Sequence, residues 1–94
     1  MYWLLLYDVV PDYLERRAAH RAEHLERAKE LERSGVLRLG GALEDPPDGA
    51  VLVFRTDDRS VVEEFARTDP YVVNGIVTRW RVRPWNVVVG ADRG

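Results

Sequence analysis

The sequence predicts an α+β fold whose strands and helices follow one another in the order βαββαβ. Three observations favour this order: four short runs rich in apolar and β-branched residues, two longer stretches with helical periodicity, and glycine or proline at the boundaries between them. Of the 94 residues, 46% are hydrophobic and 32% are charged, which is typical of a globular protein. We expect one domain over residues 1–94, of which 86–94 form a C-terminal tail.

The composition excludes several classes of function. A net charge of −2 predicts no general attraction to nucleic acid or to an anionic membrane. Cysteine is absent, which excludes disulfide bonds and thiol catalysis, and we expect no cofactor. The first ten residues, MYWLLLYDVV, lack a positively charged start and contain Asp8, so they predict neither a signal peptide nor a membrane span. We therefore expect a cytoplasmic protein with no nucleic-acid or membrane partner.

The first half of the chain predicts a strand, a long helix and a second strand. Residues 2–9 are apolar at consecutive positions, which is typical of a strand covered on both faces. Asp12 predicts a helix N-cap, and the apolar spacing after it predicts one helix from about 13 to 33. Gly35 supplies the left-handed residue that ends this helix, and residues 36–42 predict the second strand.

The second half begins with a turn at residues 44–49, which have the sequence EDPPDG. Residues 50–56 are rich in valine and phenylalanine and predict the third strand. A second helix should follow, because Asp57, Asp58 and Ser60 are each suited to cap its first turn.

The second helix should end at Asp69, because Pro70 pushes its predecessor out of the α region. Residues 76–82 alternate in polarity and predict the fourth strand. Residues 85–89 predict either a continuation of that strand or an extension that binds a partner. The order βαββαβ is that of the ferredoxin-like split motif.

The burial pattern also predicts self-association. Two helices cover only one face of a four-stranded sheet, whereas the run at residues 2–9 is apolar on both of its faces. A chain of this length buries only about 60–70% of its unfolded surface, so a lone monomer would be marginally stable. A second copy packed sheet to sheet would cover the open face, and we expect a homodimer or a higher oligomer built from it.

The first helix carries a polar patch on the side that should meet the sheet. At about 100° per residue, its inner stripe consists of Leu14, Ala18, Arg21, Leu25 and Ala28. Arg17 and His24 lie along the edge of that stripe. Arginine is rarely buried without a partner, so these positions predict a polar site where helix and sheet meet. Long arginine stems that run along the core edge would explain the same pattern.

The segment from His20 to His24 spells H-x-x-E-H, the inverted zinc-protease signature. A catalytic zinc needs a third protein ligand and an open position. The chain has no third histidine and no cysteine, and arginines flank both histidines. We therefore expect no metal site here.

Several motifs occur together in an order that is informative. They are Arg17-x-x-x-Arg21-x-x-His24-Leu25, Gly40 after the second strand, Asp69-Pro70-Tyr71, NGIV at 74–77 and VRPW at 82–85. In this order and spacing, from residues 2 to 85, the chain resembles the YciI-like (YCII-related) family.

The resemblance implies a ferredoxin-like sandwich that pairs as a dimeric α+β barrel. It also implies an active site built on a histidine and an aspartate, which correspond to His24 and Asp69. Arg17 and Arg21 match recurrent basic positions of the family, whereas His20 has no counterpart. Most members lack an assigned reaction, although acid–base eliminations such as dehydrohalogenation of hydroxylated rings are associated with the family.

The chemistry of these residue types fits that expectation. Histidine takes and gives a proton near neutral pH, and a carboxylate on one ring nitrogen sets the tautomer. Arg17 and Arg21 would then bind an anionic or enolate oxygen. Asp69 would lie at a helix C-terminus, where its charge opposes the helix dipole, although an Asp-Pro pair also simply starts turns.

The remaining candidates complete a predicted substrate site. Tyr7 and Asp8 end the first strand and would reach the same pocket, or else pack in the core and begin a turn. Gly40 and Tyr71 follow from the family motifs, although the family's usual Gly-Pro is a Gly-Gly pair here. The sequence thus favours a small acid/base lyase or isomerase acting on a small, anionic or ring-hydroxylated substrate. The alternative is a non-catalytic dimeric module that binds a small ligand or another protein.

Overall fold

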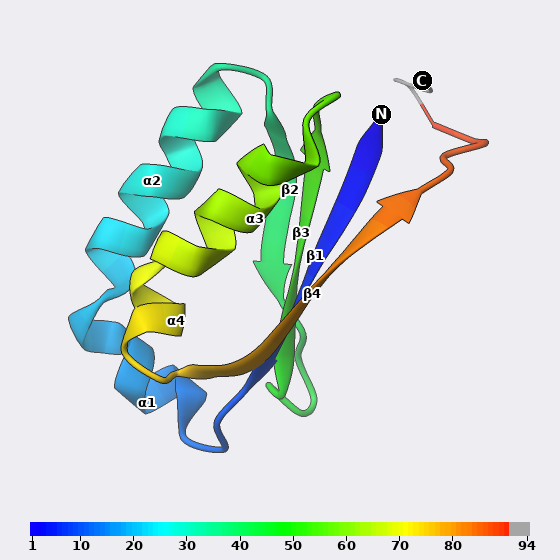
Figure 1. The fold of residues 1–94 in the computed structure, drawn as a ribbon. Helices are drawn as coiled ribbons and strands as arrows, with labels where there is room; N and C mark the ends of the chain where they lie inside the picture. The colour runs from blue at the N-terminus through cyan, green and yellow to red at the C-terminus, as the bar shows by residue number, and fades with distance from the viewer. Residues whose placement is uncertain (91–94) are drawn as a thin grey trace.

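The computed structural model describes residues 1–90 of the chain. Its elements are β1 (Tyr2–Val9), α1 (Tyr13–Arg16), the 3₁₀ turn η1 (Arg17–Ala19), α2 (Arg21–Arg33), β2 (Leu37–Ala42), β3 (Gly49–Arg55), α3 (Arg59–Thr68), α4 (Pro70–Val73) and β4 (Val77–Trp85). The strands form one antiparallel sheet in the order β2-β3-β1-β4, and the helices lie on one of its faces (Figure 1). This arrangement confirms the predicted ferredoxin-like α+β sandwich.

The prediction of one continuous helix over 13–33 is wrong. The backbone leaves the helical region at His20, with φ −120° and ψ 0°, and α2 begins at the next residue. The Asp12 carboxylate accepts no capping hydrogen bond in α1; the Asp12 carbonyl instead accepts a hydrogen bond from the Arg16 N–H at 2.9 Å. Leu14 is 53% exposed and does not continue the sheet-facing stripe, whereas Tyr13 is buried. Tertiary packing, and not the periodicity of the sequence, sets which side of α1 is buried.

The predicted start of α3 and the predicted end of α2 are confirmed. Asp58 caps α3, and its carboxylate accepts hydrogen bonds from the Ser60 N–H at 2.9 Å and the Ser60 hydroxyl at 2.6 Å. Both bonds lower the pKa of the Asp58 carboxyl. Gly35 follows α2 with φ +84°, the left-handed conformation that favours glycine.

The helix-facing side of the sheet carries the core. Alternation along β1 directs Trp3, Leu5 and Tyr7 toward the helices, and all three are buried. Phe54 on β3 is fully buried and meets Phe65 of α3 edge-on, with ring centroids 5.5 Å apart. These contacts hold α3 against the centre of the sheet.

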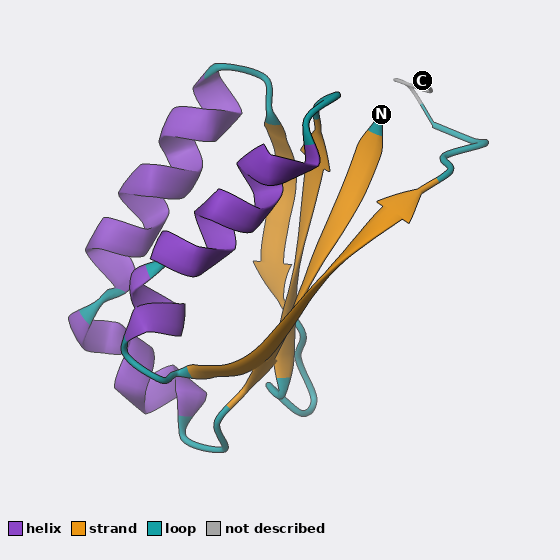
Figure 2. Ribbon diagram, in the orientation of Figure 1, coloured by secondary structure: helices purple, strands orange, loops and turns teal. Residues whose placement is uncertain are grey.

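The opposite sheet face is apolar at its centre, and no helix of the described chain covers it (Figure 2). Leu4 and Leu6 of β1 pair with Val53 and Val51 of β3 on this face. Leu39 of β2, which is opposite Val53, is 70% exposed. On the same face, Arg83 and Arg81 of β4 pair with Leu4 and Leu6 of β1. Within residues 1–90, no helix is long and apolar enough to cross a membrane.

The C-terminal strand is longer than predicted. It continues through Trp85, so part of the predicted extension belongs to the sheet. No strand follows in residues 86–90. The end of the predicted tail, 91–94, lies outside the described residues.

Gly49 permits a close approach between β3 and β1. A Cβ atom added there would lie 2.8 Å from the carbonyl oxygen of Tyr7, so the Gly49→Ala variant must shift backbone. We expect it to lower the free energy of unfolding by roughly 1–3 kcal/mol in urea titrations. The control is Gly41→Ala, whose added Cβ meets nothing within 4 Å and should change stability by less than about 0.5 kcal/mol. Equal stability of the two variants would contradict this explanation.

Candidate functional site

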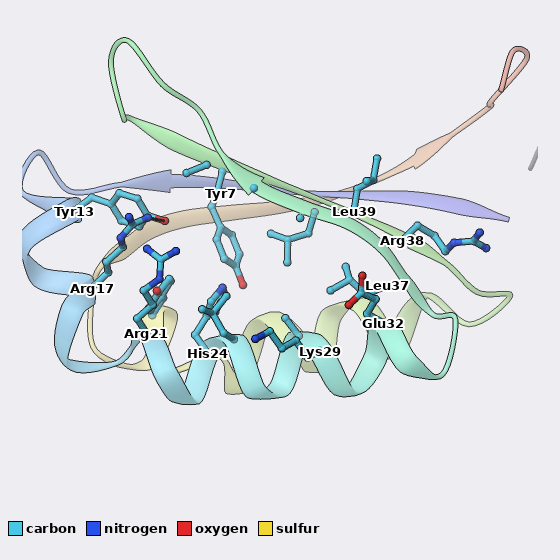
Figure 3. Close-up of a pocket in the computed structure, with 18 residues that line it drawn as sticks. Tyr7, Tyr13, Arg17, Arg21, His24, Lys29, Glu32, Leu37, Arg38 and Leu39 are labelled. Carbon is cyan, nitrogen blue, oxygen red and sulfur yellow. Dashed lines mark hydrogen bonds between the residues drawn. The ribbon is translucent and has the colours of Figure 1, made fainter. Parts of the chain in front are cut away.

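A cavity of about 260 Å³ lies between α2 and the neighbouring strands, on the helix-facing side of the sheet (Figure 3). One wall comes from η1 and α2, which supply Arg17, Arg21 and His24. The other comes from β2 and β3. The volume suits a single small metabolite rather than a nucleotide or a peptide.

Small residues of the sheet create this hollow. Gly40 and Ala42 of β2 lie beside Leu52 and Ala50 of β3, and the last pair is Ala42 with Ala50. All four line the cavity. Because three of them carry a methyl group or no side chain, α2 spans the sheet without filling the space beneath it. Gly40 is therefore part of the pocket, as the family motif implied, and it serves as its floor.

The carboxylate of Asp69 is fully buried and accepts three hydrogen bonds. Its Oδ1 lies 2.9 Å from Nδ1 of His24, and its Oδ2 is 3.1 Å from the same nitrogen. The hydroxyl of Tyr7 donates to Oδ2 at 2.7 Å, and the backbone N–H of Tyr71 donates to Oδ1 at 2.9 Å. A buried carboxylate needs such partners, and these three come from β1, α2 and α4.

The backbone around Asp69 explains why this side chain is held so firmly. The residue ends α3 in an extended conformation, with φ −64° and ψ 126°, and is at the same time the N-cap of α4. Pro70 occupies the first helical position of α4, where its missing N–H costs nothing. The predicted position at the C-terminus of the second helix is confirmed, and the carboxylate in addition accepts from the N-terminal turn of α4, which the sequence did not predict.

Two aromatic rings hold the imidazole of His24. The Tyr71 ring stacks on it, with centroids 4.0 Å apart and planes inclined by 11°. Phe65 meets it edge-on at 6.3 Å. The side chain is 13% exposed and lines the cavity. Since the carboxylate can only accept, Nδ1 carries the proton, and a neutral ring then presents the Nε2 lone pair.

Tyr7 reaches the site through Asp69. Burial raises the pKa of the Tyr7 hydroxyl, and the charge of Asp69 raises it further. The hydroxyl consequently remains a donor to the carboxylate throughout the neutral range. Asp8, by contrast, does not line the cavity and is exposed. Successive side chains of a strand point to opposite faces, so Asp8 does not reach the pocket that its neighbour lines, and the prediction that places it there is wrong.

The two predicted arginines lie at one end of the cavity, beside Tyr13 (Figure 3). The guanidinium of Arg17 donates to the Tyr13 hydroxyl at 3.4 Å and lies 5.1 Å from the centre of its ring. Burial raises the pKa of Tyr71, and the charges of Arg17 and Arg21 oppose that shift. The structure thus gathers every predicted site residue except Asp8 around one pocket.

The histidine pair does not form a metal site in the geometry described. Nδ1 of His24 is engaged by Asp69, and His20 lies at the interruption between η1 and α2 rather than in the pocket wall. Among residues 1–90, no three histidine, cysteine, aspartate or glutamate side chains come together to hold a metal ion. The expected lack of bound zinc stays a prediction.

The comparison with known families agrees with this geometry. A family model described as the YCII-related domain matches residues 1–86. The chain belongs to this family.

Individual relatives of this YCII-related domain are similar over nearly its whole length. An uncharacterized protein of Haemophilus influenzae is 29% identical over 97 residues, which cover 94% of this chain and 99% of that protein. The solved structure of 5-chloro-2-hydroxyhydroquinone dehydrochlorinase (TftG) from Burkholderia phenoliruptrix AC1100, in complex with 2,5-dihydroxybenzoquinone, has a TM-score of 0.76. It is 22% identical, and the match covers 90% of this chain and 93% of the other. This likeness shows a shared fold.

Two features of the pocket were not predicted from the sequence. The first is the bond from Tyr7 to Asp69, which joins residues 62 positions apart. The second is the floor of small residues, of which only Gly40 was predicted as a site residue, from the family motif.

The Tyr7 hydroxyl provides a test of this geometry at high pH. Its pKa is raised in the folded protein, so above about pH 10 the unfolded chain releases a proton that the folded chain keeps. Stability should then fall by up to about 1.4 kcal/mol per pH unit from this group. We expect Tyr7→Phe to reduce that alkaline slope in urea titrations. At pH 7 the same variant should lose roughly 1.5–3 kcal/mol, because a hydrogen bond to a charged group is removed. An unchanged alkaline slope would show that the hydroxyl is not buried against Asp69.

Proposed function

We propose that this YCII-related protein is a small enzyme of the lyase or isomerase type, which uses His24 and Asp69 for general acid–base chemistry on a small, anionic or ring-hydroxylated substrate. The supporting observation is the hydrogen bond between His24 Nδ1 and the buried Asp69 carboxylate at the wall of a cavity. A histidine with one nitrogen held by a carboxylate and the other available to a pocket is equipped for proton transfer.

In the proposed reaction, Nε2 of His24 takes a proton from a carbon or hydroxyl of the substrate. The electron pair left behind moves onto a conjugated oxygen, whose negative charge Arg17 and Arg21 stabilise. Asp69 balances the positive charge of the imidazolium that forms. In an isomerisation, the proton on Nε2 is then returned to another substrate atom. In an elimination, the electron pair instead returns from the oxygen and expels a leaving group as an anion, and the proton on Nε2 passes to solvent, which restores the neutral imidazole.

The fold neighbour suggests which reaction to try first. It is a dehydrochlorinase of a chlorinated hydroxyhydroquinone, solved with a dihydroxybenzoquinone. Loss of hydrogen chloride from such a ring is an elimination of the proposed kind. The class of substrate to test first is therefore a ring with hydroxyl groups and a leaving group on an adjacent carbon.

The decisive variants are His24→Asn and its matched control His20→Asn. With 5-chloro-2-hydroxyhydroquinone as the trial substrate and chloride release as the measurement, we expect His24→Asn to lose about 10²-fold or more in turnover. The control should behave as wild type, because His20 does not line the cavity. Binding of 2,5-dihydroxybenzoquinone should persist in both variants. If His24→Asn turned over as fast as wild type, the proposal of acid–base catalysis by His24 would be wrong. A wild-type protein that binds 2,5-dihydroxybenzoquinone but releases no chloride would instead favour a module that only binds ligands.

We also propose that the open sheet face is covered by a second copy of the chain. Its apolar centre consists of Leu4, Leu6, Val51, Val53 and Leu39. An apolar face of this kind is buried when two sheets pack together, and a two-fold dimer brings the same patch from both copies.

Leu39 tests the dimer because it is 70% exposed and is not needed for the protomer's own core. It also lines the cavity, so the measurement is the oligomeric state and not ligand binding. Sedimentation of the wild-type protein at micromolar concentration should show a dimer, and Leu39→Glu should shift it toward a folded monomer, because an unpaired carboxylate is unfavourable in an apolar interface. The control is Val88→Glu, which is also 70% exposed but lies beyond the sheet. A wild-type protein that sediments as a folded monomer would contradict this proposal.

A further inference from the structure

Most of the charged side chains that line the cavity are positive. Arg17, Arg21 and Lys29 line its helical wall, and Glu32 is the one acidic side chain in the lining. The strands supply a floor of glycine, alanine and leucine, together with Tyr7 and one further cation, Arg38. A chain with a net charge of −2 thus has a pocket with a cationic rim above an apolar floor.

Lys29 stands out within this rim. It is the only lysine in the sequence, against thirteen arginines. Its amino end is directed along the pocket toward His24 (Figure 3). Within the described part of the chain, its ammonium makes no ion pair, whereas Arg33 of the same helix pairs with Glu26 at 3.7 Å. Lys29 is therefore a cation on the pocket wall that is available to an incoming anion.

The positions along α2 place Lys29 and Arg21 on opposite sides of His24. At 1.5 Å per residue, Arg21 is about 4.5 Å before His24 along the helix axis, and Lys29 is about 7.5 Å after it. Both long side chains can bend inward toward the imidazole. A molecule whose reacting atom lies against His24 would therefore meet a cation at each end.

The end of the cavity beyond Lys29 carries both signs of charge. Glu32 lies one helical turn after Lys29, and Arg38 of β2 lines the same end (Figure 3). Of these two cations, Lys29 is directed toward His24, whereas Arg38 points away from it (Figure 3). Lys29 is therefore the cation at this end that can reach an acidic group on a molecule bound against His24.

We infer that the pocket takes a small, planar, oxygenated carboxylic acid, and that Lys29 binds its carboxylate. In this arrangement the flat part of the molecule lies on Gly40, Ala42 and Ala50, and the oxygen that becomes negative faces Arg17 and Arg21. This inference rests on the proposed function only for the identity of the reacting atom, because the carboxylate contact needs no catalysis. It adds a specificity-determining residue to the site.

Two matched probes test this assignment. Hydroquinone and 2,5-dihydroxybenzoate differ only in the carboxylate, and their dissociation constants can be measured by calorimetry under nitrogen. Wild type should bind the acid about fivefold or more tightly than hydroquinone, as expected for one charge-assisted contact at a partly solvated site. In Lys29→Gln the preference should fall below about twofold, and Lys29→Arg should restore it. The control Arg33→Gln removes the same charge outside the pocket and should keep the wild-type preference.

Because Lys29 is the only lysine of the sequence, its contact with a carboxylate can also be observed directly by NMR. Reductive methylation with ¹³C-formaldehyde keeps the positive charge and labels only Lys29 and the amino terminus. The Lys29 methyl signal, assigned by its loss in Lys29→Gln, should shift on addition of 2,5-dihydroxybenzoate and remain in place with hydroquinone. Equal shifts with both probes, or no shift with the acid, would overturn the assignment.

The predicted preference for the carboxylic acid over hydroquinone does not depend on whether the protein is an enzyme. His24→Asn should keep the preference for the acid, since binding at Lys29 does not involve proton transfer. An unchanged preference in Lys29→Gln overturns the carboxylate subsite and leaves the acid–base proposal standing. A preference that depends on Lys29, together with full turnover in His24→Asn, supports the subsite and overturns the acid–base proposal instead.

Discussion

The buried carboxylate of Asp69 is the group on which the arrangement of the site depends. It is the one charged side chain that is buried within residues 1–90. A carboxylate removed from water costs several kcal/mol unless donors satisfy its oxygens. Here the donors are a strand tyrosine, Tyr7, a helix histidine, His24, and the backbone of Tyr71 at the start of α4. Each of the three elements must therefore approach the same point, and the pocket forms where they meet because the same side chains make its wall.

The cavity and the packed core lie on the same face of the sheet and differ in the size of the side chains that the strands supply. Large side chains such as Phe54 fill the space under α3, whereas Gly40, Ala42 and Ala50 leave the space under α2 unfilled. Glycine within a strand loses more conformational freedom on folding than other residues, so the floor of the pocket lowers stability. This loss of stability disturbs the sheet least in the edge strand β2, because β2 pairs with a neighbouring strand on one side only.

Alternation along β1 separates two proposed roles of the sheet. Trp3, Leu5 and Tyr7 point toward the helices, and the last of them holds Asp69. Leu4 and Leu6 point to the opposite face, where a second copy would pack. Because adjacent side chains of a strand face opposite sides, the interface and the pocket can share one strand without sharing a side chain. The cations Arg17, Arg21 and Lys29 belong to η1 and α2 and lie away from the proposed interface (Figure 3).

The sequence by itself determined the elements, their order and most of their ends, because periodicity, caps and turn residues act within a few positions of one another. It also placed His24 at the edge of the sheet-facing stripe, and family resemblance, rather than spacing, paired it with Asp69, 45 positions away. The tertiary structure alone decided that Tyr7 rather than Asp8 reaches this pair, that the carboxylate caps α4, and that the first helix is interrupted at His20. These features depend on which distant groups are buried together, and local patterns carry no information about such contacts until the strands are paired and the helices are packed.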